Sequence, residues 1–158
     1  MNDTATSKSY HHGNLRAELL DTAIEQLREA GVEDLSLRAL ARAIGVSQTA
    51  PYRHFGDKSE LLAAMATYGY RDLLDALRQA GTATGDCPQE QLFAFAHAYV
   101  DYAARNPQLF KLMFGPAVQP TVKYPELREA SRDTLQLVQD ILQRGVDSGV
   151  FRHVDDIA

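Results

Sequence analysis

Gln48, Thr49 and Ala50 form the run of this 158-residue chain whose side chains best suggest a chemistry. A glutamine amide can pair with the edge of an adenine, and the methyl groups of threonine and alanine can contact the methyl group of a thymine. Arg38, further upstream, carries a guanidinium that can bind a guanine or a phosphate. These residue types indicate contact with duplex DNA if one exposed element presents them; the alternative is that Gln48 and Thr49 are simply solvated.

The segment over residues 35–62 predicts the elements that would present these side chains. Apolar residues recur at helical spacing over Ser36–Ala43, which begins with a serine suited to the N-cap. Gly45 can adopt the left-handed conformation that ends a helix. A short second helix is predicted over Ser47–Phe55, and a third begins at Asp57. A helix, a tight turn and a second helix make up a helix-turn-helix unit.

The predicted second helix is too short to be stable alone, so packing must hold it. We expect Val46 and Phe55 to supply that packing. Pro51 stands near the first turn, where a missing N–H costs least. Tyr52 and Phe55 are three residues apart, which predicts that they lie near one face of the helix.

The charge of this segment differs from that of the whole chain. The chain has a formal net charge of −5, which is unusual for a DNA-binding protein. Within residues 36–58, however, the charged residues are Arg38, Arg42, Arg53 and Lys58 against Asp57 alone. DNA responds to the local face that meets its phosphates, so this distribution is compatible with binding. The alternative is that the four basic residues belong to an ordinary solvated surface.

The same segment resembles the DNA-binding domain of TetR-family transcriptional regulators. The most specific part is the string Tyr52-Arg53-His54-Phe55, followed by Asp57-Lys58 and Leu61-Leu62. The string YHHGNLR at residues 10–16 resembles the opening of one TetR subgroup. Asn106-Pro107 and the string LMFGP at residues 112–116 resemble that subgroup's regulatory domain. Pro51 departs from the aliphatic residue commoner in the wider family, so base preferences are not carried over.

The resemblance implies roles for further residues. Tyr52, His54 and Lys58 match family positions that touch the DNA backbone, and their hydroxyl, imidazole and ammonium groups can all donate to phosphate oxygens. Ser36 and Ser47 stand at predicted helix N-termini, where the helix dipole favours anions. The alternatives are that Tyr52 belongs to the core and that His54 is a packing residue.

The whole chain predicts an all-α fold, with an N-terminal three-helix helix-turn-helix domain and a C-terminal helical regulatory domain. The expected division is a flexible arm over residues 1–12, a DNA-binding domain over 13–58 and a helical effector-binding and dimerisation domain over 59–158. Lys8 in the arm is a further candidate for contact with phosphate or the minor groove. Apolar spacing also predicts helices over Asn14–Ala30, Asp57–Ala80, Gln89–Arg105, Pro107–Phe114 and Pro125–Asp147.

The second domain contains candidates for an effector pocket. They are aromatic or thioether side chains, which suit a small apolar molecule: Phe95, Tyr99, Tyr102, Phe110, Met113 and Phe114. Helical spacing places the first three along one face. A buried tyrosine hydroxyl needs a partner, which favours a cavity. The alternative is that all six form solid core.

Other classes of site have weaker support in the sequence. His97 and Asp101 lie four apart on a predicted helix and can ligate a metal, but a surface pair is the simpler interpretation. No catalytic residues, metal site or cofactor are predicted, and the chain is not expected to be an enzyme. The single Cys87, the lack of a membrane span and the polar N-terminus predict a cytoplasmic protein.

The segment Val154–Ala158 looks like the start of another helix. The resemblance implies two further helices that dimerise as a four-helix bundle, so truncation is favoured over a different mode of dimerisation. The predicted function is a ligand-responsive repressor that binds a palindromic operator in double-stranded DNA as a homodimer and is released by a small apolar effector. The alternatives are a DNA-binding protein without a small ligand and, more remotely, an all-helical enzyme.

Overall fold

The computed structural model describes residues 14–152, in which every regular element is a helix. The predicted all-α fold is therefore confirmed. The arm with Lys8 and the segment Val154–Ala158 lie outside the described residues. In chain order the elements are α1 (Leu15–Ala30), α2 (Leu37–Ile44), the 3₁₀ helix η1 (Ala50–Arg53), α3 (Lys58–Thr82), α4 (Pro88–Arg105), α5 (Pro107–Phe114), the 3₁₀ helices η2 (Pro116–Val118) and η3 (Thr121–Lys123), and α6 (Pro125–Asp147).

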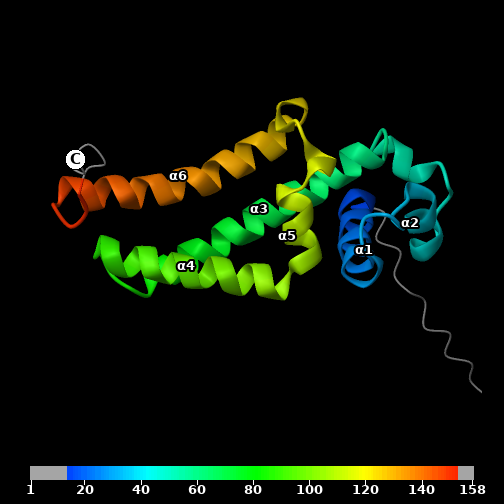
Figure 1. Ribbon diagram of the computed structural model, residues 1–158. Coiled ribbons are helices and arrows are strands. Elements are labelled where there is room, and N and C mark those ends of the chain that lie inside the picture. Colours follow the sequence, from blue (N-terminus) through cyan, green and yellow to red (C-terminus); the bar gives the residue numbers. More distant parts are fainter. Residues whose placement is uncertain (1–13, 153–158) are drawn as a thin grey trace, which may run out of the picture.

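Helix α3 joins the two halves of the molecule (Figure 1). Its first turns pack against α1, and the rest packs against α4, α5 and α6. Leu61 and Met65 near its start and Leu73 and Leu77 near its end are all fully buried or nearly so. One continuous apolar cluster therefore runs along α3 from the N-terminal helices to α6. The helix was predicted over Asp57–Ala80 and differs from that by only one or two residues at each end.

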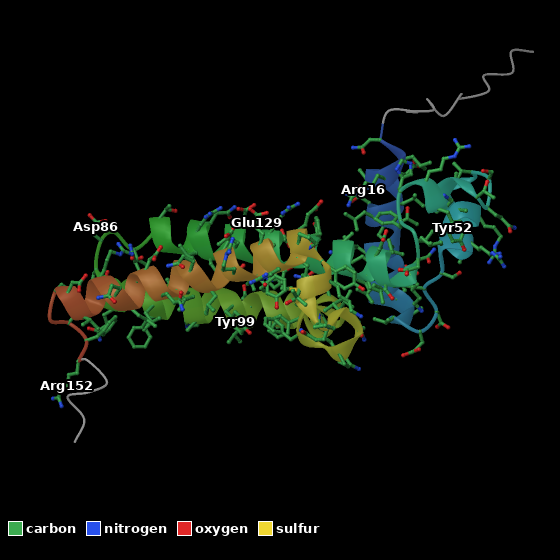
Figure 2. The ribbon with its side chains drawn as sticks, turned by 90° about the horizontal axis from the view of Figure 1, so that it is seen from above. Arg16, Tyr52, Asp86, Tyr99, Glu129 and Arg152 are labelled. Carbon is green, nitrogen blue, oxygen red and sulfur yellow. The ribbon has the colours of Figure 1, made fainter. Side chains whose placement is uncertain are left out.

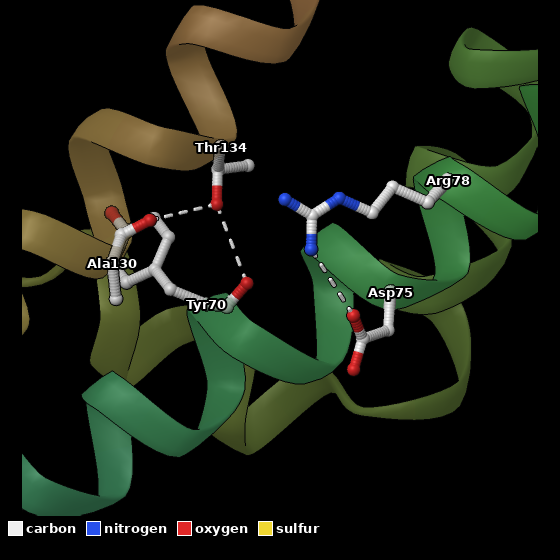
Figure 3. Close-up of polar contacts among 5 residues, drawn as sticks. All are labelled: Tyr70, Asp75, Arg78, Ala130 and Thr134. Carbon is white, nitrogen blue, oxygen red and sulfur yellow. Dashed lines mark hydrogen bonds and ion pairs between the residues drawn. The ribbon is translucent and has the colours of Figure 1, made fainter.

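The helical domain is held to α3 by buried hydroxyl groups as well as by apolar packing. The hydroxyl of Tyr102 in α4 donates to the carbonyl oxygen of Gly69 at 3.0 Å. The hydroxyl of Thr134 in α6 lies between the carbonyl oxygens of Ala130, at 2.9 Å, and Tyr70, at 3.3 Å (Figure 3). Side chains of both α4 and α6 thus bind adjacent backbone carbonyls in the middle of α3.

Gly69 allows α5 to approach α3 closely. A Cβ atom at this position would lie 2.6 Å from the sulfur of Met113 and 3.1 Å from Cγ of Leu109. The hydroxyl of Tyr70 reaches the carbonyl oxygen of Met113 at 3.2 Å. The short helix α5 is therefore fixed against the centre of α3.

Across residues 14–152, no helix combines the length and the apolar composition needed to cross a bilayer.

Candidate nucleic-acid interface

Helix α2 has the start and the end that its sequence predicts. The Ser36 hydroxyl oxygen accepts a hydrogen bond from the backbone N–H of Ala39 at 3.1 Å, so Ser36 is the N-cap. At the other end Gly45 adopts φ 77° and ψ 27°. The backbone N–H of Val46 then reaches the carbonyl oxygen of Ala41 at 3.0 Å, which closes the chain reversal after the helix.

The following recognition segment, residues 47–55, is less helical than predicted. Only Ala50–Arg53 is helical, as a 3₁₀ turn, and Gln48 and Thr49 form the turn before it. Most of its backbone bonds span three residues, as from the N–H of Tyr52 to the carbonyl of Thr49 at 3.2 Å. Pro51 has no N–H to donate to the preceding turn, so a regular α-helix over Ser47–Phe55 loses an early bond. The predicted nine-residue α-helix is therefore wrong in form, although the segment occupies the predicted place.

Burial of two residues anchors the recognition segment. Phe55 is 2% exposed and Pro51 is also buried. Tyr52, by contrast, is 46% exposed, so the two rings differ in burial. The guanidinium of Arg16 from α1 lies 5.2 Å from the centroid of the Phe55 ring, a cation–π contact.

The residues predicted to read bases are accessible. Gln48, Thr49 and Arg38 are exposed, and Ala50 is half-buried. The hydroxyl oxygens of Ser47 and Thr49 are 3.3 Å apart, so the two side chains support each other across the turn. The polar groups of this turn therefore face solvent while the ring of Phe55 faces the core.

The residues predicted to touch phosphates are distributed around this turn. Tyr52 and His54 are exposed on or beside η1, and Ser36 is exposed at the start of α2. Lys58 is half-buried, and its ammonium donates to the backbone carbonyl of Glu33 at 3.2 Å, which leaves further N–H donors. Figure 2 shows Tyr52 and Arg16 at the same end of the molecule.

The start of α3 fixes the exit of the recognition segment. The carboxylate of Asp57 accepts from the backbone N–H of Glu60 at 2.9 Å, and the carboxylate of Glu60 accepts from the N–H of Gly56 at 2.7 Å. This reciprocal arrangement is a capping box, with Gly56 rather than the N-cap residue as the second donor.

Three basic residues at this end were absent from the predicted site. Arg42 and Arg53 are exposed on α2 and η1, and Arg16 is exposed on α1. The count of basic residues in the segment gave a signal for the first two. Nothing local predicts Arg16, because its partner Phe55 is far away in the chain.

The six predicted effector residues differ in burial. Phe95, Tyr102 and Met113 are buried in the core. Tyr99, Phe110 and Phe114 form an aromatic cluster in which ring centroids are 4.7 to 6.5 Å apart, and Phe114 is 50% exposed. Tyr99, labelled in Figure 2, is 38% exposed. The alternative interpretation, in which these side chains form solid core, fits Phe95, Tyr102 and Met113.

The helical domain also has a cleft of about 540 Å³. The α3–α4 loop, which contributes to its lining, lies at the end of the molecule farthest from the helix-turn-helix (Figure 1). The cleft is lined by residues from α3, the α3–α4 loop, α4 and α6: Arg78, Gly81, Thr82, Gly85, Asp86, Gln91, Phe95, Leu137, Ile141 and Arg144. Gln91 is largely buried and accepts from the guanidinium of Arg144 at 2.6 Å. Of the six predicted residues, Phe95 alone lines this cleft.

The tyrosines of the core are held neutral. Burial raises the pKa of Tyr102 well above its ordinary value, with a smaller contribution from Asp72. Burial likewise raises the pKa of Tyr70. Both hydroxyls therefore remain hydrogen-bond donors at any pH near neutrality.

The pair considered as a metal site has an ordinary surface setting. His97 and Asp101 are both exposed, and Asp101 forms an ion pair with Arg105 at 2.6 Å. Within residues 14–152, no group of three histidine, cysteine or carboxylate side chains is placed to hold a metal.

Comparison with known proteins identifies both halves of this arrangement. A family model described as bacterial regulatory proteins, tetR family, matches residues 19–65. A second, described as a tetracyclin repressor-like C-terminal domain, matches residues 92–157. The HTH-type transcriptional regulator Rv1816 of Mycobacterium tuberculosis is 31% identical over 147 residues, which are 91% of this chain and 62% of that protein. The chain thus spans under two thirds of the length of such curated relatives.

Solved structures agree with these matches. A protein of unknown function from Rhodococcus sp. RHA1 is 37% identical, with a TM-score of 0.80 over 90% of this chain and 73% of its own. The TetR-family transcriptional regulator PfmR of Thermus thermophilus is 31% identical, with a TM-score of 0.65 over 86% of this chain and 74% of its own. The exposed turn, its buried anchor and these similarities lead to one conclusion: the chain belongs to the TetR family of helix-turn-helix transcriptional regulators.

Proposed function

We propose that this regulator binds a palindromic operator in double-stranded DNA as a homodimer and represses transcription from it. The observation that carries the proposal is the exposure of Gln48 and Thr49 on a turn anchored from behind by Phe55 and Pro51. Such a turn can enter the major groove without exposing its apolar side. In a homodimer, two recognition segments would meet successive grooves roughly 34–36 Å apart.

The exposed groups divide by chemistry into two sets. Gln48, Thr49 and Ala50 offer an amide and methyl groups to base edges, and Arg38 can bind a guanine or a phosphate. The second set binds the DNA backbone through hydroxyl, imidazole and ammonium donors: Ser36, Ser47, Tyr52, His54 and Lys58. Backbone contacts fix the register of the protein on the duplex, and base contacts select the sequence.

Substitutions at the two sets test this division. Tyr52→Ala and Lys58→Ala should weaken binding to all duplexes alike, and Lys58→Ala should lower the slope of log affinity against log salt by about one unit. Gln48→Ala should instead change the order of the protein's affinities for duplexes of different sequence. Fluorescence anisotropy over a salt series measures both effects, with Lys111→Ala on α5 as the matched control for a lost exposed charge. Unchanged affinity in both backbone variants would refute the interface.

We also propose that a small, mainly apolar effector controls the protein, and that it binds in the cleft at the far end of α3. Phe95, Leu137 and Ile141 supply an apolar lining, while Arg78 and Arg144 supply guanidinium groups. This composition suits an apolar molecule with one acidic group. The cleft replaces the predicted aromatic set as the proposed site, since that set is divided between core and surface.

Control through this cleft would act as a shift between conformations. An effector weakens DNA binding if it binds more tightly to a conformation in which α3 is placed unsuitably for the operator. The size of the effect is set by the difference between the effector's affinities for this conformation and for the one that binds DNA. α3 is suited to this role because it lines the cleft through Arg78 and Gly81 and also begins at the recognition segment.

A thermal-shift screen of apolar acids, followed by anisotropy with DNA, tests the effector. A hit should weaken DNA binding in the wild type and lose its effect in Ile141→Trp, which fills the cleft. Silence across the screen would favour the alternative, a DNA-binding regulator whose helical domain serves only assembly.

A further inference from the structure

A second, smaller cleft lies between the helix-turn-helix and the helical domain. Its volume is about 230 Å³. It is lined by the first turn of α1, the first half of α3, the end of η3 and the start of α6: Arg16, Glu60, Ala63, Ala64, Thr67, Lys123, Tyr124, Pro125, Glu126 and Leu127. The cleft therefore has one wall from each half of the molecule, and it is separate from the effector cleft at the far end of α3.

The charged side chains that line this cleft differ in whether they have a polar or oppositely charged partner. The carboxylate of Glu126 pairs with Arg71 at 3.8 Å, and that of Glu60 accepts a backbone N–H at 2.7 Å. Within residues 14–152, neither Arg16 nor Lys123 has a carboxylate within ion-pair distance. Arg16 and Lys123 therefore lack a carboxylate partner and can attract an anionic ligand, whereas Glu126 and Glu60 have contacts to Arg71 and to the N–H of Gly56.

The same wall of the cleft holds the recognition segment. Arg16 lies over the ring of Phe55, the buried anchor of that segment. Glu60 binds the N–H of Gly56, the next residue. A ligand that draws the guanidinium of Arg16 into the cleft takes it from Phe55, and a ligand that also binds Lys123 couples this change to η3 and α6.

We propose that this interdomain cleft binds a small oxyanion, a carboxylate or a phosphate, between Arg16 and Lys123, and that the bound anion weakens the hold on the recognition segment. The binding step is independent of the proposed function. The effect of the anion on DNA binding rests on the proposed function. Anion binding and its effect on DNA binding are therefore tested separately.

A tryptophan in the cleft reports on the binding step. The chain has no tryptophan, so Tyr124→Trp introduces a single tryptophan in the cleft lining. Inorganic phosphate and acetate are titrated separately at constant ionic strength, with chloride as the reference. We expect a saturable change of emission with at least one oxyanion and none with chloride, and the two titrations show which class binds. No saturable response to either oxyanion would overturn the proposal.

Second-site variants assign the response to the cleft. In the Tyr124→Trp background, Arg16→Gln and Lys123→Gln should each weaken anion binding about tenfold, because each removes a charge-assisted hydrogen bond. Lys111→Gln on α5, which removes an equal charge outside the cleft, should leave it unchanged. Equal affinity in all three variants would place the anion elsewhere and overturn the assignment.

The consequence for DNA is measured with the same anion. Phosphate at constant ionic strength should weaken binding of the wild type to a duplex, and Lys123→Gln should remove most of that effect without altering binding in chloride. Equal weakening in both proteins would mean competition at the DNA surface and would overturn the regulatory step. Failure to bind any duplex would refute the proposed function, and the emission titration would still decide the anion site.

Discussion

At the scale of single residues, the helical domain depends on hydroxyl groups that are buried and used. Tyr102 and Thr134 donate to the carbonyl oxygens of Gly69 and Tyr70, two consecutive residues of α3. Among the described residues no buried side-chain nitrogen or oxygen lacks a partner. These hydroxyls therefore add direction to packing that would otherwise be apolar and adaptable.

Removing one hydroxyl should have a moderate cost. We expect Tyr102→Phe to lower the free energy of unfolding by about 1 kcal/mol, because the ring remains and only the bond to Gly69 is lost. Urea unfolding measures the change. Tyr99→Phe is the control, since Tyr99 is 38% exposed and its ring contacts are retained. Equal stability of the two variants would contradict the role of the buried bond.

The same hydroxyl should make stability depend on alkaline pH. The pKa of Tyr102 is raised above its ordinary value of 10.0, first by burial and then by Asp72. A folded state that holds its proton more tightly is fully stabilised below pH 10, and the stabilisation is lost as the pH rises further. Stability of the wild type should fall above pH 10 more steeply than that of Tyr102→Phe, as measured by urea unfolding at each pH. Parallel curves would exclude this contribution.

At the scale of elements, local backbone bonds determine where the recognition segment begins and ends. Gly45 reverses the chain after α2, and the carboxylates of Asp57 and Glu60 begin α3. Between these two points the segment has little regular structure of its own. Its position therefore depends on these two flanking ends as well as on its buried residues Phe55 and Pro51.

Loss of the N-cap should weaken the start of α3. We expect Asp57→Ala to lower the free energy of unfolding by about 1 kcal/mol, whereas Asp57→Asn should cost much less because an asparagine oxygen also accepts from the N–H of Glu60. Chemical denaturation followed by circular dichroism compares the two. Similar losses in both variants would show that charge, rather than capping, is what matters there.

The turn at Gly45 should tolerate only residues that accept a left-handed conformation. With φ at 77°, Gly45→Ala should cost about 1–2 kcal/mol even though its Cβ would meet no neighbour within 4 Å. Gly45→Asn should cost less, because asparagine adopts this conformation more readily. The thermal midpoints of the two variants test the prediction, and a stable alanine variant would contradict it.

At the scale of the whole molecule, the two halves share one core through α3. The apolar cluster includes Leu19 of α1, Leu61 of α3 and Ile141 of α6. A side-chain bond from Arg28 of α1 to Asn106, at 3.5 Å, adds a second link between the halves. Neither half buries its apolar surface without the other.

Unfolding should therefore be a single transition. Far-ultraviolet circular dichroism reports all helices, while most of the tyrosines behind the near-ultraviolet signal lie in α3 or after it in the chain: Tyr68, Tyr70, Tyr99, Tyr102 and Tyr124. The two signals should change together with temperature. Two separate midpoints would show that the helix-turn-helix unfolds independently of the helical domain.

The amino-acid sequence alone determined the α-helices and their ends, but not the form of the recognition segment. The spacing of apolar residues, Ser36 and Asp57 as caps and Gly45 as a turn predicted α1, α2 and α3 to within two residues, because these signals act between residues close in the chain. The same signals predicted exposure of Gln48 and Thr49. The family string around Tyr52 predicted which positions face the DNA backbone, an assignment that the binding experiments above will test.

Only the tertiary structure decided how distant segments meet. It placed Arg16 over Phe55, made the recognition segment a 3₁₀ turn and divided the six aromatic and thioether residues between core and surface. It also formed the cleft in which Gly81 and Phe95 meet Ile141. Helical periodicity shows that a side chain lies on an apolar face, but long-range packing decides whether that face meets another helix, a cleft or water.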